Sequence, residues 1–340
     1  MKNRRFRFIV NFFVILIVLS IVLYFSLKDN YEEIIFSIMH MNPWYIILAV
    51  LILLCYRVLA GIGYYLIVRT NREQVSLLRC IQINFIILFF HGITPFAGGG
   101  QPMEVYYLHK EGIPVTKATN VTLQNFIVYQ ISLVMVGVFA LVYNHYFCLF
   151  PSDHFIKRLV FLGFSINLLI LVFSFVLSFG KRFQQFVSKK CIRFLTKIKI
   201  IKEEKVVQEK LEEYLKSFHK NALQLRKNKR VVIGAIFINI LALSIMYSMP
   251  YVIAKGMNVS LSVLDVIVTT AYVMIIGSFI PIPGGTGGIE YGFVFFFGYF
   301  ISGSILNAIM LVWRFVSYYL GMILGAIALS LYRKKEKICG

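Results

Sequence analysis

Long apolar stretches separated by short polar segments dominate this chain. Six of them reach the roughly 20 residues that an α-helix needs to cross a bilayer. They cover approximately Phe8–Leu27, Pro43–Val68, Ala118–Tyr143, Leu159–Phe179, Val231–Ala254 and Ser304–Tyr332. The pattern predicts an all-α polytopic membrane protein in which residues 1–340 form a single integral membrane domain.

Two further apolar stretches, residues 80–108 and 264–302, are interrupted by proline and glycine. The interruptions read TPFAGGGQPMEVYYL from position 94 and IPIPGGTGGIEYGFV from position 280. Proline ends a helix, and non-helical backbone at membrane depth must be buried in protein or line a wet cavity. Each stretch is therefore predicted to be a re-entrant hairpin of two helices, which leaves the membrane on the side from which it entered.

The basic residues indicate the orientation of these segments. Lys and Arg gather at the N-terminus, around Arg69 and Arg79, in residues 333–340, and in residues 181–230, which hold 16 Lys and Arg against five Glu. Cytoplasmic loops of membrane proteins carry such an excess. Both termini and the 181–230 segment are therefore expected in the cytoplasm. The first hairpin then enters from the cytoplasmic side, and the second hairpin enters from outside.

The two hairpins belong to an internal repeat. At an offset of 186 residues, the difference between positions 290 and 104, Glu104 aligns with Glu290 and the pattern P-x-x-G-G-x-x-x-x-E recurs without a gap. The flanking spans align too, so that repeat one covers about 43–143 and repeat two about 229–332. The copies face opposite sides, and in transporters such inverted-topology repeats place the substrate near the midplane. Close helix packing by small residues is the alternative explanation.

The turns of the hairpins supply candidate residues for binding a substrate. New helices are expected to begin near Gln101 or Met103 and near Gly288 or Ile289, and helix N-termini present free N–H groups to an anion. Glycine at a turn allows positive φ and close approach of a ligand to the backbone. The candidates are Gly98, Gly99, Gly100, Gln101, Gly284, Gly285 and Thr286.

Four ionisable residues at predicted membrane depth complete the candidate site. Glu104 and Glu290 begin the second limbs of the hairpins, whereas Arg57 and Arg314 lie in the middle of apolar spans. Charged groups inside membranes are expensive and usually functional. The arginines are expected either to pair with these carboxylates or to receive an anionic ligand, and the sequence leaves the pairing open. Helix capping by the glutamates and purely structural ion pairs are the alternatives.

Composition narrows the classes of function. The chain is 59% hydrophobic with a mean hydropathy of +0.77, so membrane orientation and anionic lipid explain its net charge of +20 better than nucleic acid does. The five cysteines show neither metal-ligand spacing nor a disulfide framework. Motifs for nucleotide binding, serine hydrolysis and metalloprotease chemistry are missing, so no catalytic residue, cofactor or metal is expected.

The motifs TPFAGGGQPMEVYYLHKEGIPVTKAT and PIPGGTGGIEYGF resemble the lysylphosphatidylglycerol synthase transmembrane region. This is the flippase half of the multiple peptide resistance factor, and it also occurs in stand-alone membrane proteins. The resemblance covers about residues 8–332. It implies the bacterial cytoplasmic membrane and translocation of an anionic or aminoacylated phospholipid, such as lysyl-phosphatidylglycerol, which would contribute to resistance against cationic antimicrobial peptides. The soluble synthase domain of full-length relatives is not expected here.

Three hypotheses about function follow. In the first, the chain is a lipid flippase that binds a phospholipid head group between its hairpins and meets an anionic membrane surface. In the second, it is the membrane component of a phosphatidylglycerol lysyltransferase or polyprenyl-phosphate glycosyltransferase system and acts with a separate enzyme. In the third, it is a passive structural membrane protein. The lipid, the energy source and the formation of a homo-oligomer are left open by the sequence.

Overall fold

The computed structural model describes residues 31–71, 73–94, 98–150, 154–179, 228–277 and 285–332. Every regular element in these ranges is a helix, which confirms the predicted all-α polytopic membrane protein. Several predicted features lie outside the described residues: the span Phe8–Leu27, residues 181–227 of the basic segment, the turn residues Pro95, Pro281 and Gly284, and both chain ends.

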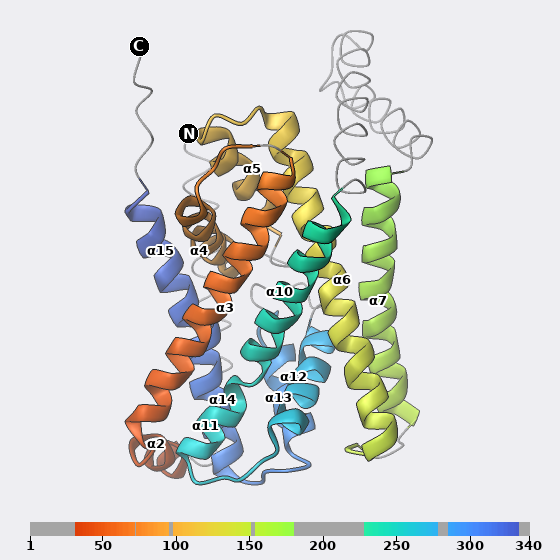
Figure 1. Ribbon diagram of the computed structural model, residues 1–340. Coiled ribbons are helices and arrows are strands. Elements are labelled where there is room, and N and C mark those ends of the chain that lie inside the picture. Colours follow the sequence, from red (N-terminus) through yellow and green to blue (C-terminus); the bar gives the residue numbers. More distant parts are fainter. Residues whose placement is uncertain are drawn as a thin grey trace, which may run out of the picture.

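Five helical segments in these ranges are long and apolar enough to cross a membrane. They are α3 (Pro43–Thr70), α6 (Val115–Phe147), α7 (His154–Phe179), the α10–α11 pair (Lys229–Tyr247 and Met249–Gly256), and a final segment made of α14 (Ser304–Arg314), the π-helix η3 (Phe315–Leu320) and α15 (Gly321–Ser330). Each corresponds to a predicted span. In Figure 1 these segments run along the long axis of the molecule.

The two interrupted stretches form pairs of shorter helices. α4 (Leu77–Ile93) and α5 (Gly100–Lys110) flank the first break, and α12 (Val263–Gly277) and α13 (Gly288–Phe297) flank the second. None of the four reaches the roughly 20 residues of a full span. The two limbs of each pair contact each other, and Figure 1 shows the first pair towards the upper end of the molecule and the second towards the lower end. The hairpins therefore enter the helix bundle from opposite ends.

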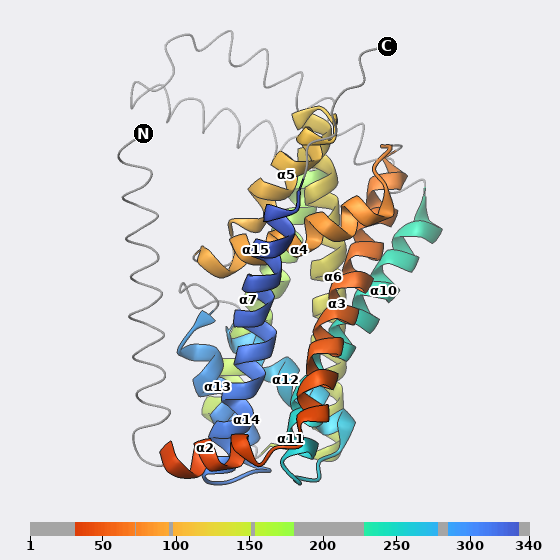
Figure 2. The ribbon, with the colours of Figure 1, turned by 90° about the vertical axis from the view of Figure 1, so that its left-hand side faces the viewer.

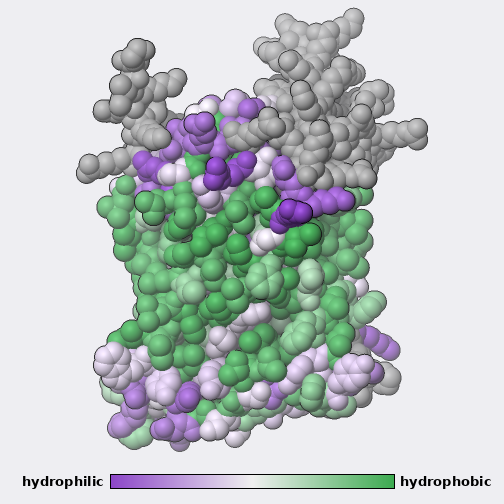
Figure 3. Space-filling model, viewed as in Figure 1, coloured by the Kyte–Doolittle hydropathy of each residue, from purple (hydrophilic) through white to green (hydrophobic). Residues whose placement is uncertain are grey.

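The surface matches this arrangement. Figure 3 shows a broad hydrophobic belt around the middle of the molecule, with polar zones at both ends. Large apolar side chains are exposed on the outer helices, among them Leu51 of α3, Phe139 of α6 and Phe173 of α7. In water such a continuous apolar surface would be unfavourable, whereas in a bilayer it contacts lipid tails.

One helix was not predicted. Between the first two predicted spans, Tyr31–Met39 form α2, which lies across the lower end of the bundle in Figure 2. Glu32 and Glu33 in its first turn favour the positive end of the helix dipole. Ile34 is fully buried, while Phe36 and Met39 are exposed. These features are typical of an amphipathic helix that rests in the membrane interface.

Glycine allows α15 and α4 to pack with their backbones in contact. A Cβ atom added to Gly325 would lie 2.7 Å from the backbone nitrogen of Phe89 and 2.8 Å from the backbone oxygen of Phe85. Both atoms belong to the backbone of α4, which cannot move aside as a flexible side chain can. The contact between the last span and the first hairpin therefore depends on this glycine.

We expect Gly325→Ala to lower the free energy of unfolding by about 1–3 kcal/mol, since it overpacks a close helix contact. Thermal unfolding of the purified protein in detergent measures the effect. Gly234→Ala in α10 is the matched control, because its Cβ would meet nothing within 4 Å. The control is expected to be neutral or slightly stabilising, because alanine favours helices over glycine. A melting temperature for Gly325→Ala equal to that of the wild type would contradict the packing argument.

Candidate functional site

The second hairpin holds a buried ion pair beside its turn. Arg314 Nε donates a hydrogen bond of 2.6 Å to Glu290 Oε1, and the side chains are only 7% and 8% exposed, respectively. The other carboxylate oxygen, Oε2, accepts a 2.7 Å hydrogen bond from the backbone N–H of Gly287. Glu290 therefore does two things at once: it caps the start of α13 and it neutralises a cation in the middle of the last span. The predicted pairing of Arg314 with a hairpin glutamate is present.

The turn of the second hairpin requires glycine for conformational reasons. Gly285 and Gly287 have φ angles of +63° and +89°, a region that other residues rarely adopt. Thr286 lies buried between them. α13 begins at Gly288, where a new helix was expected. The loop thus brings the N–H of Gly287 onto the Glu290 carboxylate, and Gly284 lies outside the described residues.

The turn of the first hairpin uses glycine for a different reason. α5 begins at Gly100, next to the predicted start, and Gly99 has an ordinary φ of −76°. A Cβ on Gly99 would lie 2.5 Å from Thr94 Cγ2, and a Cβ on Gly100 would collide with the ring of His91. The backbone N–H of Gly99 donates to Thr94 Oγ1 over 2.8 Å. These glycines close the turn tightly onto the end of α4.

Two further candidates lie at the same turn. Gly98 is exposed in the turn itself, and Gln101 is half-buried in the first turn of α5.

Glu104, the repeat partner of Glu290, is buried without a cation. It is 5% exposed, and none of the ion pairs among the described residues includes it. Asn125 Nδ2 approaches Glu104 Oε1 at 3.5 Å, and the hydroxyls of Tyr64 and Thr122 lie near the carboxylate but outside hydrogen-bond geometry. At the repeat offset, the position equivalent to Arg314 is Val128, which carries no charge. The two repeats therefore differ in charge at their glutamates.

Tyr318 of the π-helix connects the two hairpins. Its hydroxyl donates a 2.8 Å hydrogen bond to the backbone oxygen of Gly92 at the end of α4, and it lies within reach of the Thr286 side chain in the second turn. Its ring covers the guanidinium of Arg314, with 4.8 Å from the ring centroid to Cζ. Single π-turns within α-helices often occur at functional sites. Tyr318 was missed in the sequence, although its position four residues after Arg314 places both on one helix face.

Arg57 is not brought to either glutamate. It lies in the middle of α3, and no ion pair among the described residues includes it. Its guanidinium lies over the ring of Tyr56, 4.5 Å from the centroid, and its buried Nε has no hydrogen-bond partner. The sequence left open whether each arginine pairs with a carboxylate or receives an anion. In the structure Arg314 pairs with a carboxylate, whereas Arg57 pairs with none among the described residues.

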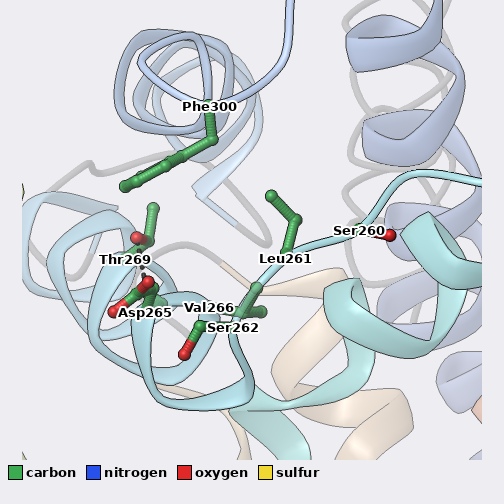
Figure 4. A pocket seen from close by; sticks show the side chains of 7 residues that line it. All are labelled: Ser260, Leu261, Ser262, Asp265, Val266, Thr269 and Phe300. Carbon is green, nitrogen blue, oxygen red and sulfur yellow. Dashed lines mark hydrogen bonds between the residues drawn. The ribbon is translucent and has the colours of Figure 1, made fainter.

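A separate cavity of about 230 Å³ opens at the lower end, at the entrance of the second hairpin. It is lined by Ser260, Leu261, Ser262, Asp265, Val266, Thr269 and Phe300, which Figure 4 shows around the start of α12. Asp265 accepts a hydrogen bond of 2.9 Å from the hydroxyl of Tyr143 on α6. None of the predicted site residues lines this cavity, so it is distinct from the hairpin turns.

The described residues contain no group of three or more His, Cys, Asp or Glu side chains that could hold a metal ion. The ionisable groups near the hairpins are one arginine neutralised by Glu290, one arginine without a counter-ion among the described residues, and one buried carboxylate without a cation among them.

Comparison with known proteins places these features in a family. Residues 11–325 match the family described as "Lysylphosphatidylglycerol synthase TM region". A UPF0104 membrane protein of Methanocaldococcus jannaschii is 25% identical over 334 residues, which cover 94% of this chain and 93% of the relative. A UPF0104 membrane protein of Archaeoglobus fulgidus is 22% identical over 321 residues, which cover 91% and 93%.

The buried pair gives a test of the geometry. Arg314→Met alone and Glu290→Gln alone are each expected to destabilise the protein by about 3–5 kcal/mol, because each leaves its partner as an uncompensated buried group. The double variant is expected to lose clearly less than the sum of the two. Thermal unfolding in detergent of the wild type, both single variants and the double variant measures this coupling.

Glu33→Gln is the control for this cycle, because Glu33 is exposed on α2 and forms no ion pair among the described residues. Its free energy of unfolding is expected to stay within about 0.5 kcal/mol of the wild-type value. Additive losses in the double variant would show that Glu290 and Arg314 do not stabilise each other.

Proposed function

The chain belongs to the family of the lysylphosphatidylglycerol synthase TM region, and on this basis we propose that it is a lipid flippase for an anionic or aminoacylated phospholipid. The observation that carries the proposal is the meeting of two hairpins from opposite ends at Tyr318, with a buried glutamate one turn beyond each break. Broken helices that meet inside an inverted repeat are the usual construction of a transport site at membrane depth.

The charges supply the chemistry of recognition. A phospholipid head group has to leave water to cross the bilayer, and buried polar groups replace the lost hydration only when they form hydrogen bonds or ion pairs. Glu290 is already neutralised by Arg314, whereas Glu104 is surrounded by the neutral side chains of Tyr64, Thr122 and Asn125 and has no cation in ion-pair contact among the described residues. Glu104 is therefore the carboxylate proposed to accept the amine or hydroxyl groups of the head group, while the acyl tails remain in the surrounding lipid.

The distribution of charge supports one orientation. At the end where the first hairpin enters lie Arg69, Arg79, Lys110, Lys117, Lys229 and Arg230. The same end holds Glu73 and Glu111, which pair with Lys117 and Arg79. The opposite end carries the acidic residues Glu32, Glu33 and Asp265 and fewer basic ones, Arg158 and Lys255. By the positive-inside rule the first of these ends is proposed to face the cytoplasm, with both chain termini on that side and the chain in the cytoplasmic membrane.

A lipid whose head group carries an amine would reduce the negative charge of the outer leaflet after translocation. Because cationic peptides bind membranes through that charge, such transport would contribute to resistance against them. This consequence follows only for an aminoacylated substrate, and an anionic substrate would give none.

In liposomes that contain the purified protein, translocation of phosphatidylglycerol and of lysyl-phosphatidylglycerol is expected to exceed that of empty liposomes. Glu104→Gln is expected to slow the preferred substrate about tenfold or more, since a charged hydrogen bond is worth roughly 1.5–3 kcal/mol. Head-group labelling of the outer leaflet over time measures the rate for both lipids.

Glu32→Gln, a change at an exposed acidic residue of α2, controls for the loss of one carboxylate and is expected to keep the wild-type rate. An unchanged rate in Glu104→Gln would remove Glu104 from the site, and rates equal to empty liposomes would refute transport by the chain alone. Transport that appears only after a co-purifying synthase or glycosyltransferase is added would favour a membrane component of an enzyme system.

A further inference from the structure

Arg57 lies halfway along a spanning helix, where its side chain is partly buried. It is near the centre of the 28 residues of α3, about 20 Å from either helix end at a rise of 1.5 Å per residue. Leu53 and Gly61, four residues before and after it, are both buried, so Arg57 lies on the inward face of α3. From this position its side chain cannot extend to water at either membrane surface.

The charge of Arg57 has no counterpart among the described residues. No carboxylate lies within ion-pair distance, and its buried Nε has no hydrogen-bond partner. Its contact with the face of Tyr56 offers a cation–π attraction, which replaces only part of the hydration that a buried guanidinium loses. Arg314, at comparable depth, differs because Glu290 neutralises it.

Three tyrosines from three helices gather around this charge. Tyr56 precedes Arg57 on α3, Tyr129 comes from α6, and Tyr247 comes from α10. Tyr247 belongs to a buried core cluster, and the partly buried Tyr56 and Tyr129 pack against that cluster. Tyr129 lies near Arg57 and Tyr56, and Tyr247 lies near both other tyrosines. None of the three hydroxyls hydrogen-bonds to another described residue. Tyrosine hydroxyls inside a protein usually form hydrogen bonds, so these three, beside a cation without a counter-ion, are available to donate to a bound acceptor.

We propose that Arg57, Tyr56, Tyr129 and Tyr247 form a subsite for a phosphate group at mid-depth in the membrane. Arginine binds phosphate oxygens through paired hydrogen bonds, and the phenol groups donate further ones without adding charge. The subsite offers a single positive charge, which balances a phosphodiester. A phosphomonoester would bring a second negative charge with no cation to meet it.

The molecule that carries this phosphate is a diacyl phospholipid undergoing translocation, and this identification rests on the proposed function. Tyr64 lies two turns further along α3 from Arg57 and is close to Glu104. A head group could therefore lie along one face of α3. Its phosphate would bind Arg57, and the groups attached to the phosphate would point towards Glu104. The glutamate then recognises what is attached to the phosphate, and the arginine recognises the phosphate itself.

Native mass spectrometry of the delipidated full-length protein tests the subsite directly. The probes are phosphatidylglycerol, phosphatidic acid, diacylglycerol and inorganic phosphate, added separately to the wild type and to variants. Arg57→Gln is expected to weaken phosphatidylglycerol binding about tenfold or more, and Tyr129→Phe and Tyr247→Phe to weaken it less. Arg69→Gln is the matched control, because Arg69 lies on the same helix over the ring of Tyr65 but is exposed. It is expected to keep wild-type affinity.

A second measurement separates a binding role from a structural one. Without lipid, Arg57→Gln is expected to melt at the wild-type temperature or above it, since it removes a charge at membrane depth that has no counter-ion among the described residues. Addition of phosphatidylglycerol is then expected to raise the melting temperature of the wild type and of Arg69→Gln, but not of Arg57→Gln. A structural arginine would give the reverse result, a less stable variant that still binds lipid.

Equal binding of phosphatidylglycerol by Arg57→Gln and the wild type would overturn the subsite, as would equal binding of diacylglycerol and phosphatidylglycerol by the wild type. Binding of inorganic phosphate alone, dependent on Arg57, would support phosphate recognition and overturn its assignment to a lipid. Tighter binding of phosphatidic acid, a phosphomonoester, than of phosphatidylglycerol would overturn the assignment of the subsite to a phosphodiester. Arg57-dependent lipid binding without translocation in liposomes would refute the flippase and leave the subsite standing.

Discussion

The ion pair between Arg314 and Glu290 is the interaction on which the arrangement of the interior depends. A guanidinium in the middle of a spanning segment is costly without a counter-charge, and for Arg314 that counter-charge is a carboxylate of the second hairpin. The pair therefore fixes the depth of the hairpin relative to the last span. Tyr318 then covers the guanidinium and bonds to the end of α4, which brings the first hairpin to the same place.

The two repeats share a plan but not a charge balance. In repeat two the Glu290 carboxylate accepts hydrogen bonds from both Gly287 of the turn and Arg314, so its charge is compensated within the repeat. Repeat one leaves Glu104 without a cation, and the unpaired arginine, Arg57, lies on a helix whose counterpart in repeat two carries Leu243 at the equivalent position. Among the described residues, the buried glutamate without a cation and the mid-span arginine without a counter-ion thus both lie in repeat one.

Much of the fold and part of the site could be predicted from the sequence. The length of the apolar stretches located the five described spans, and the repeat offset located the hairpins and both glutamates. These features depend only on the spacing of residues along the chain. The partner of each arginine could not be predicted, since pairing depends on helix rotation and depth. Tyr318 and the arginine-associated Tyr129 and Tyr247 were missed because tyrosine is common in spans of this chain. α2 was missed because nine residues with two glutamates resemble a loop in a search for spans.

The π-helix within the last span has a mechanical consequence. A π-turn accommodates one residue more than an α-turn, and each residue advances an α-helix by 100° about its axis. If Phe315–Leu320 tightened into regular α-helix, α15 would have to rotate by roughly that angle against α14, or slide along its neighbours. The phenol of Tyr318 would leave the Gly92 carbonyl, and Gly325 would turn away from the α4 backbone. A transition of this π-turn to α-helix would thus rotate α15, together with its contact to α4, relative to α14.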